Sequence, residues 1–101
     1  MSNLRIPIPT EEIDAFCRRW NVKELAVFGS ALRDDFGPDS DIDILVELRP
    51  DPGLSLFDWM DMIDQLKQIF GRDVDLVEKR AIRNPFRRKA ILSSYEVIHA
   101  A

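Results

Sequence analysis

The stretch from Val27 to Val46 constrains this chain most, because it links two apolar runs through a Gly-Ser turn and an Asp-x-Asp pair. The turn is Gly29-Ser30, and Asp41 and Asp43 stand two residues apart where the second apolar run begins. On an extended strand, side chains two residues apart point to the same face. Adjacent carboxylates repel each other unless a cation lies between them, and Mg²⁺ typically binds one or two carboxylates plus substrate phosphates. The stretch therefore indicates a metal-dependent site for phosphoryl or nucleotidyl transfer.

The Gly-Ser turn strengthens this interpretation, since its backbone N–H groups and its hydroxyl can bind a phosphate. The aspartates alone would not suffice. An alternating Asp-Ile-Asp-Ile is also an ordinary half-buried strand pattern, and a lone Asp-x-Asp is more often a solvated strand edge. The combination of turn, spacer and paired acids favours the functional interpretation.

A third acidic side chain stands alone in the next apolar run. Asp75 lies between Val74 and Leu76-Val77 in a predicted strand that should pair beside the strand carrying the first two acids. Burying an acid in such a segment is unfavourable without a cation or hydrogen bonds. The alternative is an edge-strand aspartate that faces water. Asp73 is the weaker substitute, because it shares the face of Asp75 but precedes the strand.

Periodicity predicts a helix, two strands and a second helix in the first 71 residues. We expect a helix that begins at Thr10 as its N-cap and ends at Asn21, with its apolar face on Ile13, Phe16, Cys17 and Trp20. Strands follow over 22–28 and 42–48, separated by a short helical turn at 31–35 and a loop at 36–40. Ser55 and Asp58 form a predicted capping box, and Gly71 ends that helix. Its stripe is expected in the core: Leu56, Trp59, Met60, Ile63, Leu66, Ile69 and Phe70.

The remaining residues predict a third strand at 74–77 and a last helix at 83–92, capped near Asn84. Residues 95–99 are expected to form a short strand or a loose end. The order of these elements predicts an α/β (α+β) fold, a small mixed sheet of three to four strands with helices packed on it.

Size and composition limit the chain to one modest core. It has 101 residues, of which 46% are hydrophobic, so we expect a single domain over residues 1–101. It has no apolar run long enough to cross a membrane and no N-terminal secretory pattern. The one cysteine, Cys17, excludes an internal disulfide and is expected to be a core thiol. These features favour a cytoplasmic protein.

Charge is distributed unevenly along the chain. The net charge is −4, and ten acidic residues against one basic residue lie between Asp34 and Asp64. Six basic residues and no acid lie between Lys79 and Lys89. An acidic protein is a poor non-specific binder of nucleic acid, so we expect cations or a basic protein partner instead. The basic run is either a solvated helix face or a contact to nucleotide phosphates or to a partner.

The string from Phe28-Gly29-Ser30 through Ser40-Asp41-Ile42-Asp43 resembles the signature of the DNA polymerase beta-like nucleotidyltransferase superfamily, and most closely its minimal nucleotidyltransferase (MNT) family. The resemblance covers about residues 25–77 and implies the core fold of that superfamily. Leu32 and Asp34 depart from a small residue and a glycine found in some members, which makes the loop stiffer and more acidic.

The resemblance implies a role for each matching residue. Asp41, Asp43 and Asp75 would be catalytic and would hold Mg²⁺, with two ions in the full site, and Asp75 would be the general base or the second-metal ligand. Nucleotide phosphates would contact Gly29, Ser30, Arg33 and Ser40. Arg33 is equally well explained as a surface residue paired with Asp34 or Asp35.

The resemblance also implies an activity. The short MNT chains are antitoxins that transfer AMP from ATP to a tyrosine of a HEPN-domain ribonuclease toxin and thereby neutralise it. We therefore expect a protein adenylyltransferase that uses ATP and Mg²⁺, with a HEPN toxin as partner, no membrane and no direct nucleic-acid binding. The main alternative is a non-catalytic antitoxin that inhibits by occlusion. A small-molecule transferase is disfavoured because such enzymes add a helical domain.

Overall fold

The computed structural model describes residues 8–29, 41–49 and 53–100. Within them the chain forms three α-helices, four strands and a 3₁₀ turn. In chain order these are α1 (Thr10–Trp20), β1 (Val22–Phe28), β2 (Ile42–Leu48), α2 (Leu56–Phe70), β3 (Val74–Glu78), η2 (Lys79–Ala81), α3 (Pro85–Ser93) and β4 (Tyr95–Ala100).

The four strands form one mixed sheet in the order β3-β2-β1-β4. β1 pairs antiparallel with both β2 and β4, whereas β2 and β3 run parallel. The expected small mixed sheet is confirmed, with four strands. The segment at 95–99 is a strand and not a loose end, because β4 completes the edge beside β1.

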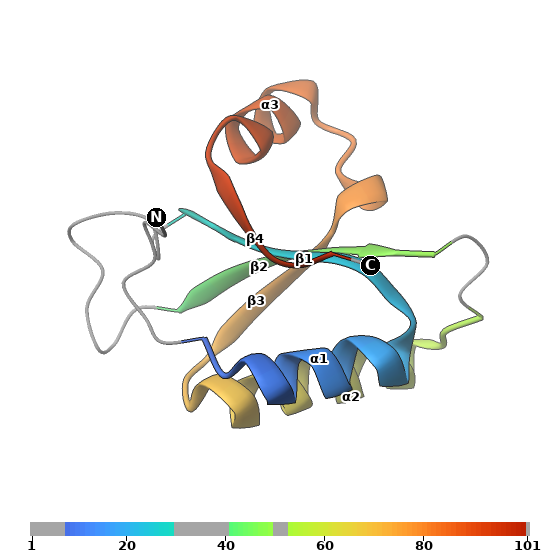
Figure 1. Cartoon of the computed structure of the whole chain (residues 1–101). Coiled ribbons are helices and arrows are strands. Elements are labelled where there is room, and N and C mark those ends of the chain that lie inside the picture. The colour runs from blue at the N-terminus through green and yellow to red at the C-terminus, as the bar shows by residue number, and fades with distance from the viewer. Residues whose placement is uncertain (1–7, 30–40, 50–52, 101) are drawn as a thin grey trace.

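Helices cover both faces of this sheet (Figure 1). α1 and α2 pack together on one face, and α3 stands alone on the other. Successive side chains of a strand point to opposite faces of the sheet. The larger cluster, against α1 and α2, includes Ile42, Ile44 and Val46 of β2, whereas Leu45 joins the smaller cluster beneath α3. Asp43 lies two residues before Leu45, so its side chain is on the same face of the sheet, which α3 covers.

The ends of the first two helices follow the predicted caps, with one exception. Ser55 and Asp58 form the expected capping box at the start of α2: the Asp58 N–H donates to Ser55 Oγ at 3.1 Å, and the Ser55 N–H donates to Asp58 Oδ2 at 2.9 Å. Asn21 and Gly71 end α1 and α2 in the left-handed conformation. The N-cap expected at Thr10 is wrong. Pro9 holds the cap position without a side-chain hydrogen bond, and the Thr10 hydroxyl donates backwards to the Ile8 carbonyl.

The stripe predicted on α2 is only partly in the core. Met62 and Leu66 are fully buried, and Trp59, Ile63, Ile69 and Phe70 pack partly against the core. Leu56 and Met60 were expected there too but are 72% and 53% exposed. The helix turns its buried face towards Met62, so the apolar first turn projects into solvent.

The last helix begins at Pro85, with the Asn84 side chain accepting from the backbone of Phe86 and Arg87, as the cap signal indicated. The helical turn expected at 31–35 and the loop at 36–40 lie outside the described residues. No helix within the described ranges is long and apolar enough to cross a membrane.

Candidate active site

The pairing of β2 with β3 brings two of the predicted catalytic acids together. The parallel register sets Asp43 of β2 directly beside Asp75 of β3. The Ile42 N–H donates to the Asp73 carbonyl at 3.0 Å, which fixes this register where β2 begins. Neighbouring strands lie about 4.8 Å apart, and like charges directly opposite each other are destabilising. The fold therefore places two adjacent carboxylates where a bound cation would remove their repulsion.

Gly29 closes the site from the side of β1. The register puts Phe28 opposite Asp43, so Gly29 follows at the strand end. Gly29 has φ of +68°, a conformation that side chains with a Cβ rarely adopt. A Cβ built on it would overlap Asp43 Oδ2 and lie 3.2 Å from Asp43 Cγ. Glycine is thus required twice at this position, by the backbone and by the adjacent carboxylate.

A pocket of about 340 Å³ opens between this end of the sheet and α3. Its sheet side is lined by Phe28, Gly29, Asp43 and Asp75. Its helix side is lined by Arg87, Ala90, Ile91 and Ser94. Pockets that hold small molecules start at about this size. The pocket thus brings together the glycine of the predicted turn and two of the predicted acids.

The other predicted site residues are placed differently or not described. Asp41 directly precedes β2, is exposed, and is not among the described residues that line the pocket. Asp75 is exposed on the edge strand β3, as expected for an edge-strand aspartate that faces water. It nevertheless lines the pocket together with Asp43. Asp73 is exposed and lies 4.0 Å from Lys67 Nζ. Ser30, Arg33 and Ser40 lie outside the described residues.

The donor set fits a hard cation with few protein ligands. In the described part of the chain, no group of three or more His, Cys, Asp or Glu side chains is arranged to hold a metal ion. Asp43 and Asp75 supply two carboxylates, which matches the one or two that Mg²⁺ usually takes, the rest being water and substrate phosphate. A site of this kind is completed by the substrate.

The helix side of the pocket was not anticipated residue by residue. Arg87, Ala90, Ile91 and Ser94 follow one another at helical spacing, which places them on one face of α3 and its end. The basic run that includes Arg87 was noted, but the sequence does not show which of its members turns towards the aspartates. That depends on how α3 packs above β1 and β2.

A second hollow, of about 380 Å³, lies between α1 and α2 on the opposite face of the sheet. Glu12, Arg19, Gln65 and Gln68 are the polar side chains that line it. It contains neither the aspartates nor the glycine turn. Gly29, Asp43 and Asp75 line the pocket beneath α3 instead, although that pocket is slightly smaller.

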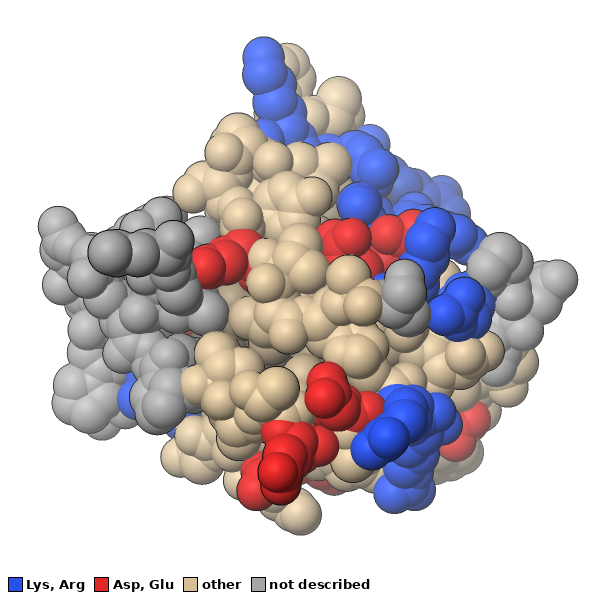
Figure 2. Space-filling view, viewed as in Figure 1, with Lys and Arg blue, Asp and Glu red and all other residues tan. Residues whose placement is uncertain are grey.

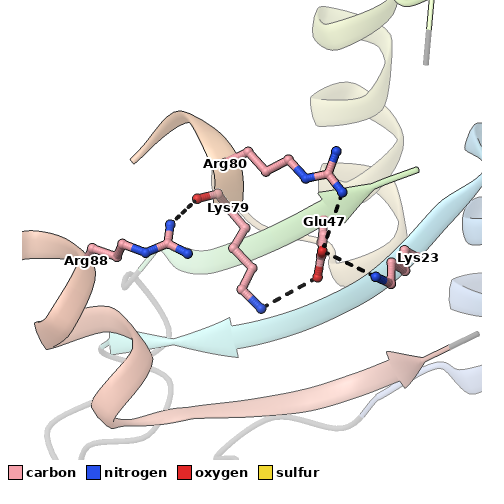
Figure 3. A network of polar contacts seen from close by, with 5 residues as sticks. All are labelled: Lys23, Glu47, Lys79, Arg80 and Arg88. Atoms are coloured by element: carbon pink, nitrogen blue, oxygen red, sulfur yellow. Dashed lines mark hydrogen bonds and ion pairs between the residues drawn. The ribbon is translucent and has the colours of Figure 1, made fainter. Parts of the chain in front are cut away.

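The basic residues around η2 form a separate network on the face of the sheet that α3 covers (Figure 3). Glu47 of β2 lies within 3.5–3.8 Å of Lys23, Lys79 and Arg80, and its side chain is only 15% exposed. Arg88 donates to the Lys79 carbonyl at 2.8 Å and so joins α3 to η2. Lys and Arg side chains gather over this part of the molecule, at the top and upper right of Figure 2.

Cys17 is a core thiol, as expected. It is 2% exposed in the cluster under α1. Burial, and to a smaller degree the charge of Asp14, raises the pKa of Cys17 to about 12. A thiol held so far from ionisation is not a nucleophile at neutral pH.

The mixed sheet, the paired strand carboxylates and the glycine beside them fit an enzyme that transfers a phosphate-containing group. The chain belongs to the nucleotidyltransferase domain family, whose sequence profile matches residues 11–98. It is a nucleotidyltransferase.

Curated relatives agree with this assignment. The chain is 38% identical over 73 residues to a putative protein adenylyltransferase of Methanocaldococcus jannaschii, covering 72% of this chain and 73% of the relative. It is also 38% identical over 66 residues to the protein adenylyltransferase MntA of Thermococcus cleftensis, covering 65% of each chain.

Solved structures share the fold. A putative minimal nucleotidyltransferase is 30% identical, with a TM-score of 0.68 over 85% of each chain. A toxin–antitoxin complex with AMP-PNP contains a chain 20% identical, with a TM-score of 0.73 over 93% of this chain and 75% of that one. A complex of tri-AMPylated Shewanella oneidensis HEPN toxin with MNT antitoxin contains a chain 19% identical, with a TM-score of 0.62 over 91% of this chain and 70% of that one.

Proposed function

We propose that this chain is an antitoxin that transfers AMP from ATP to a tyrosine of a cognate HEPN-domain toxin, with Mg²⁺, and so neutralises the toxin. The observation that carries the proposal is the pairing of Asp43 with Asp75 beside Gly29 inside one pocket. Two relatives support the reaction by their names, one a protein adenylyltransferase and the other a putative protein adenylyltransferase. The complex of an MNT antitoxin with a tri-AMPylated HEPN toxin supports the partner.

Each acid has a proposed role. Asp41, Asp43 and Asp75 are the proposed Mg²⁺ ligands, with two ions in the full site. When bound, Mg²⁺ neutralises the triphosphate and lowers the pKa of the attacking hydroxyl. The proposed role of Asp75, which is exposed and lines the pocket, is to accept the proton of an incoming hydroxyl. Gly29 lets the backbone approach the phosphates, and Ser30, Arg33 and Ser40 remain proposed phosphate contacts.

The proposed reaction is a displacement at the α-phosphorus of ATP. The tyrosine oxygen forms a new P–O bond, and the bond from the α-phosphorus to the oxygen that bridges to the β-phosphate breaks. Pyrophosphate carries away the electron pair of that bond. The hydroxyl proton passes to the Asp75 carboxylate and then to water. No oxidant or further reactant is needed.

An open pocket edge suits a protein substrate. Asp75 lies on an edge strand and is exposed, so a side chain of another protein can reach it directly. We place this protein in the cytoplasm, where its proposed partner would act.

The second candidate is an antitoxin that inhibits by occlusion alone. It is favoured by one observation, the exposed apolar first turn of α2, where Leu56, Phe57 and Met60 are 72%, 77% and 53% exposed. An exposed apolar patch is typical of a protein-binding surface. In this case the carboxylates would be dispensable.

Mass spectrometry of the cognate toxin separates the two functions. The toxin is incubated with this protein, ATP and Mg²⁺, and then digested to locate the modified residue. The proposal predicts a mass increase of one or more AMP units on a tyrosine and no increase with the Asp41→Asn/Asp43→Asn double variant. An unmodified toxin that is still neutralised by wild type and double variant alike would establish occlusion instead.

A further inference from the structure

The pocket beneath α3 has two walls of opposite charge. The sheet wall carries Asp43 and Asp75, and the helix wall carries Arg87. Arg87 is the only cation among the described residues that line this pocket. The three remaining helix-side residues, Ala90, Ile91 and Ser94, are uncharged and short or apolar, so they leave the guanidinium as the only charged group on that wall.

Three of the five other basic residues in the run from Lys79 to Lys89 make contacts elsewhere. Lys79 and Arg80 pair with Glu47, and Arg88 donates to the Lys79 carbonyl (Figure 3). Lys89 lines a different hollow, with Pro85 and Leu92. Among the described residues, no carboxylate lies within ion-pairing distance of Arg87, although Asp43 and Asp75 line the same pocket.

The chemistry of this wall suits a phosphate chain. A nucleotide that is bound through a cation to the aspartates presents further phosphate oxygens to the opposite side of the pocket. Arginine offers a planar fork of N–H donors that matches two phosphate oxygens at once, and charge-assisted hydrogen bonds of this kind are the strong ones. A guanidinium engaged by a carboxylate would have to be released first, whereas Arg87 has no such ion pair among the described residues.

We propose that Arg87 is a substrate-binding residue that holds the polyphosphate of the nucleotide from the α3 wall, opposite the aspartates. The inference rests on the proposed nucleotidyl transfer at this pocket. It assigns one member of the basic run to the nucleotide and leaves the others to the Glu47 network and to solvent. Arg87 acts on binding through the phosphates, not through the base.

Calorimetric binding of three ligands tests the assignment: Mg·ATP, inorganic tripolyphosphate without metal, and adenosine. Losing a hydrogen bond to a charged group typically weakens binding by about tenfold to a hundredfold. Arg87→Ala is expected to weaken Mg·ATP and tripolyphosphate by about that factor and to leave any adenosine binding unchanged. Arg87→Lys, which keeps the charge but not the fork, should recover part of the loss.

Lys89→Ala is the matched control, because it removes one positive charge from the same helix outside the pocket. The inference is overturned if Lys89→Ala weakens tripolyphosphate as much as Arg87→Ala does. It is equally overturned if Arg87→Ala binds tripolyphosphate like wild type, or if wild type binds no polyphosphate. Arg87 is exposed, so its variants should fold; circular dichroism checks this, and Arg87→Lys alone decides the matter if Arg87→Ala does not fold.

The binding assay also separates this inference from the proposed function. If the toxin is never adenylylated but Arg87→Ala still loses tripolyphosphate, the transfer proposal fails and the phosphate site stands. If transfer occurs with the same KM for ATP in wild type and Arg87→Ala, the proposed function stands and the assignment of Arg87 fails.

Discussion

At the residue scale, the candidate site depends on a glycine that no other residue can replace without disturbing a carboxylate. Gly29 combines a positive φ with direct proximity to Asp43. Gly53 has a similar φ of +64°, but a Cβ there would meet nothing within 4 Å. The two positions thus share the backbone requirement and differ only in the neighbouring carboxylate.

This difference makes a matched pair of variants. Gly29→Ala and Gly53→Ala should each lose about 1–2 kcal/mol of stability from the left-handed backbone. Only Gly29→Ala should also displace Asp43 and reduce AMP transfer by at least about tenfold, a barrier increase of about 1.4 kcal/mol. Thermal unfolding and transfer rates measure the two effects. Equal activity of the two variants would show that Asp43 is not needed where the structure puts it.

Cys17 predicts a specific pH dependence. Its pKa is raised to about 12 in the fold, above the ordinary value of 9.0, so the folded state holds the thiol proton more tightly than the unfolded state. That contribution to stability is complete below about pH 9 and is lost as the pH rises towards 12. Urea unfolding from pH 8.5 to 11 should therefore show wild type losing stability faster than Cys17→Ala. Parallel curves for the two proteins would contradict the burial of this thiol.

At the element scale, the N-cap predicted at Ser55 forms, whereas the N-cap predicted at Thr10 does not. The Ser55 hydroxyl accepts from the Asp58 N–H, whereas Thr10, an equally good cap residue by sequence, donates backwards to Ile8. Pro9 precedes Thr10 and occupies the cap position itself, which shifts the helix start by one residue. Local residue type therefore predicted the capping box at α2 but not the start of α1.

Ser55→Ala should destabilise the protein by about 1 kcal/mol, the usual value for losing an N-cap. Thr10→Ala should change stability by less than about 0.5 kcal/mol, because an exposed hydroxyl that caps nothing is removed. Chemical denaturation of both variants measures the difference. A larger loss for Thr10→Ala than for Ser55→Ala would mean that the cap at α1 forms after all.

The Glu47 network connects β1, β2 and η2 through one carboxylate with three cations. Because Glu47 is mostly buried and its partners crowd around it, Glu47→Gln should lose about 1 kcal/mol and should lower the salt dependence of stability. The control is Asp73→Asn, which removes an exposed pair with Lys67 at 4.0 Å and should be nearly neutral. Denaturation at two salt concentrations compares them.

At the scale of the whole molecule, the fold class followed from the sequence but the pocket did not. Alternation and turn signals predicted the strands at 22–28 and 42–48, and β1 and β2 have those bounds. The strand with Asp75 was expected beside the strand at 42–48, whereas the parallel direction and the register that sets Asp75 beside Asp43 come from the structure. Which residues of α3 line the pocket depends on the angle at which α3 packs on the sheet. The pattern of residues 83–92 therefore could not single out Arg87.

The surface of α2 was mispredicted for a related reason. Seven apolar residues fit one helical stripe, but the sheet covers only part of the helix surface. Met62, which is outside that stripe, is fully buried together with Leu66. Leu56 and Met60 are left outside. Periodicity identifies an amphipathic helix well, yet it does not tell which edge of a wide stripe the core reaches.

The central claim is that Asp43 and Asp75 act together on one nucleotide, and label transfer from α-³²P-ATP to the cognate toxin in single-turnover reactions tests it most directly. Asp43→Asn and Asp75→Asn should each lower the rate of transfer by at least about a hundredfold, or about 2.7 kcal/mol. Asp73→Asn, two residues before Asp75 on the same chain, should transfer at the wild-type rate. Wild-type transfer by Asp75→Asn, or an equal loss with Asp73→Asn, would contradict the account.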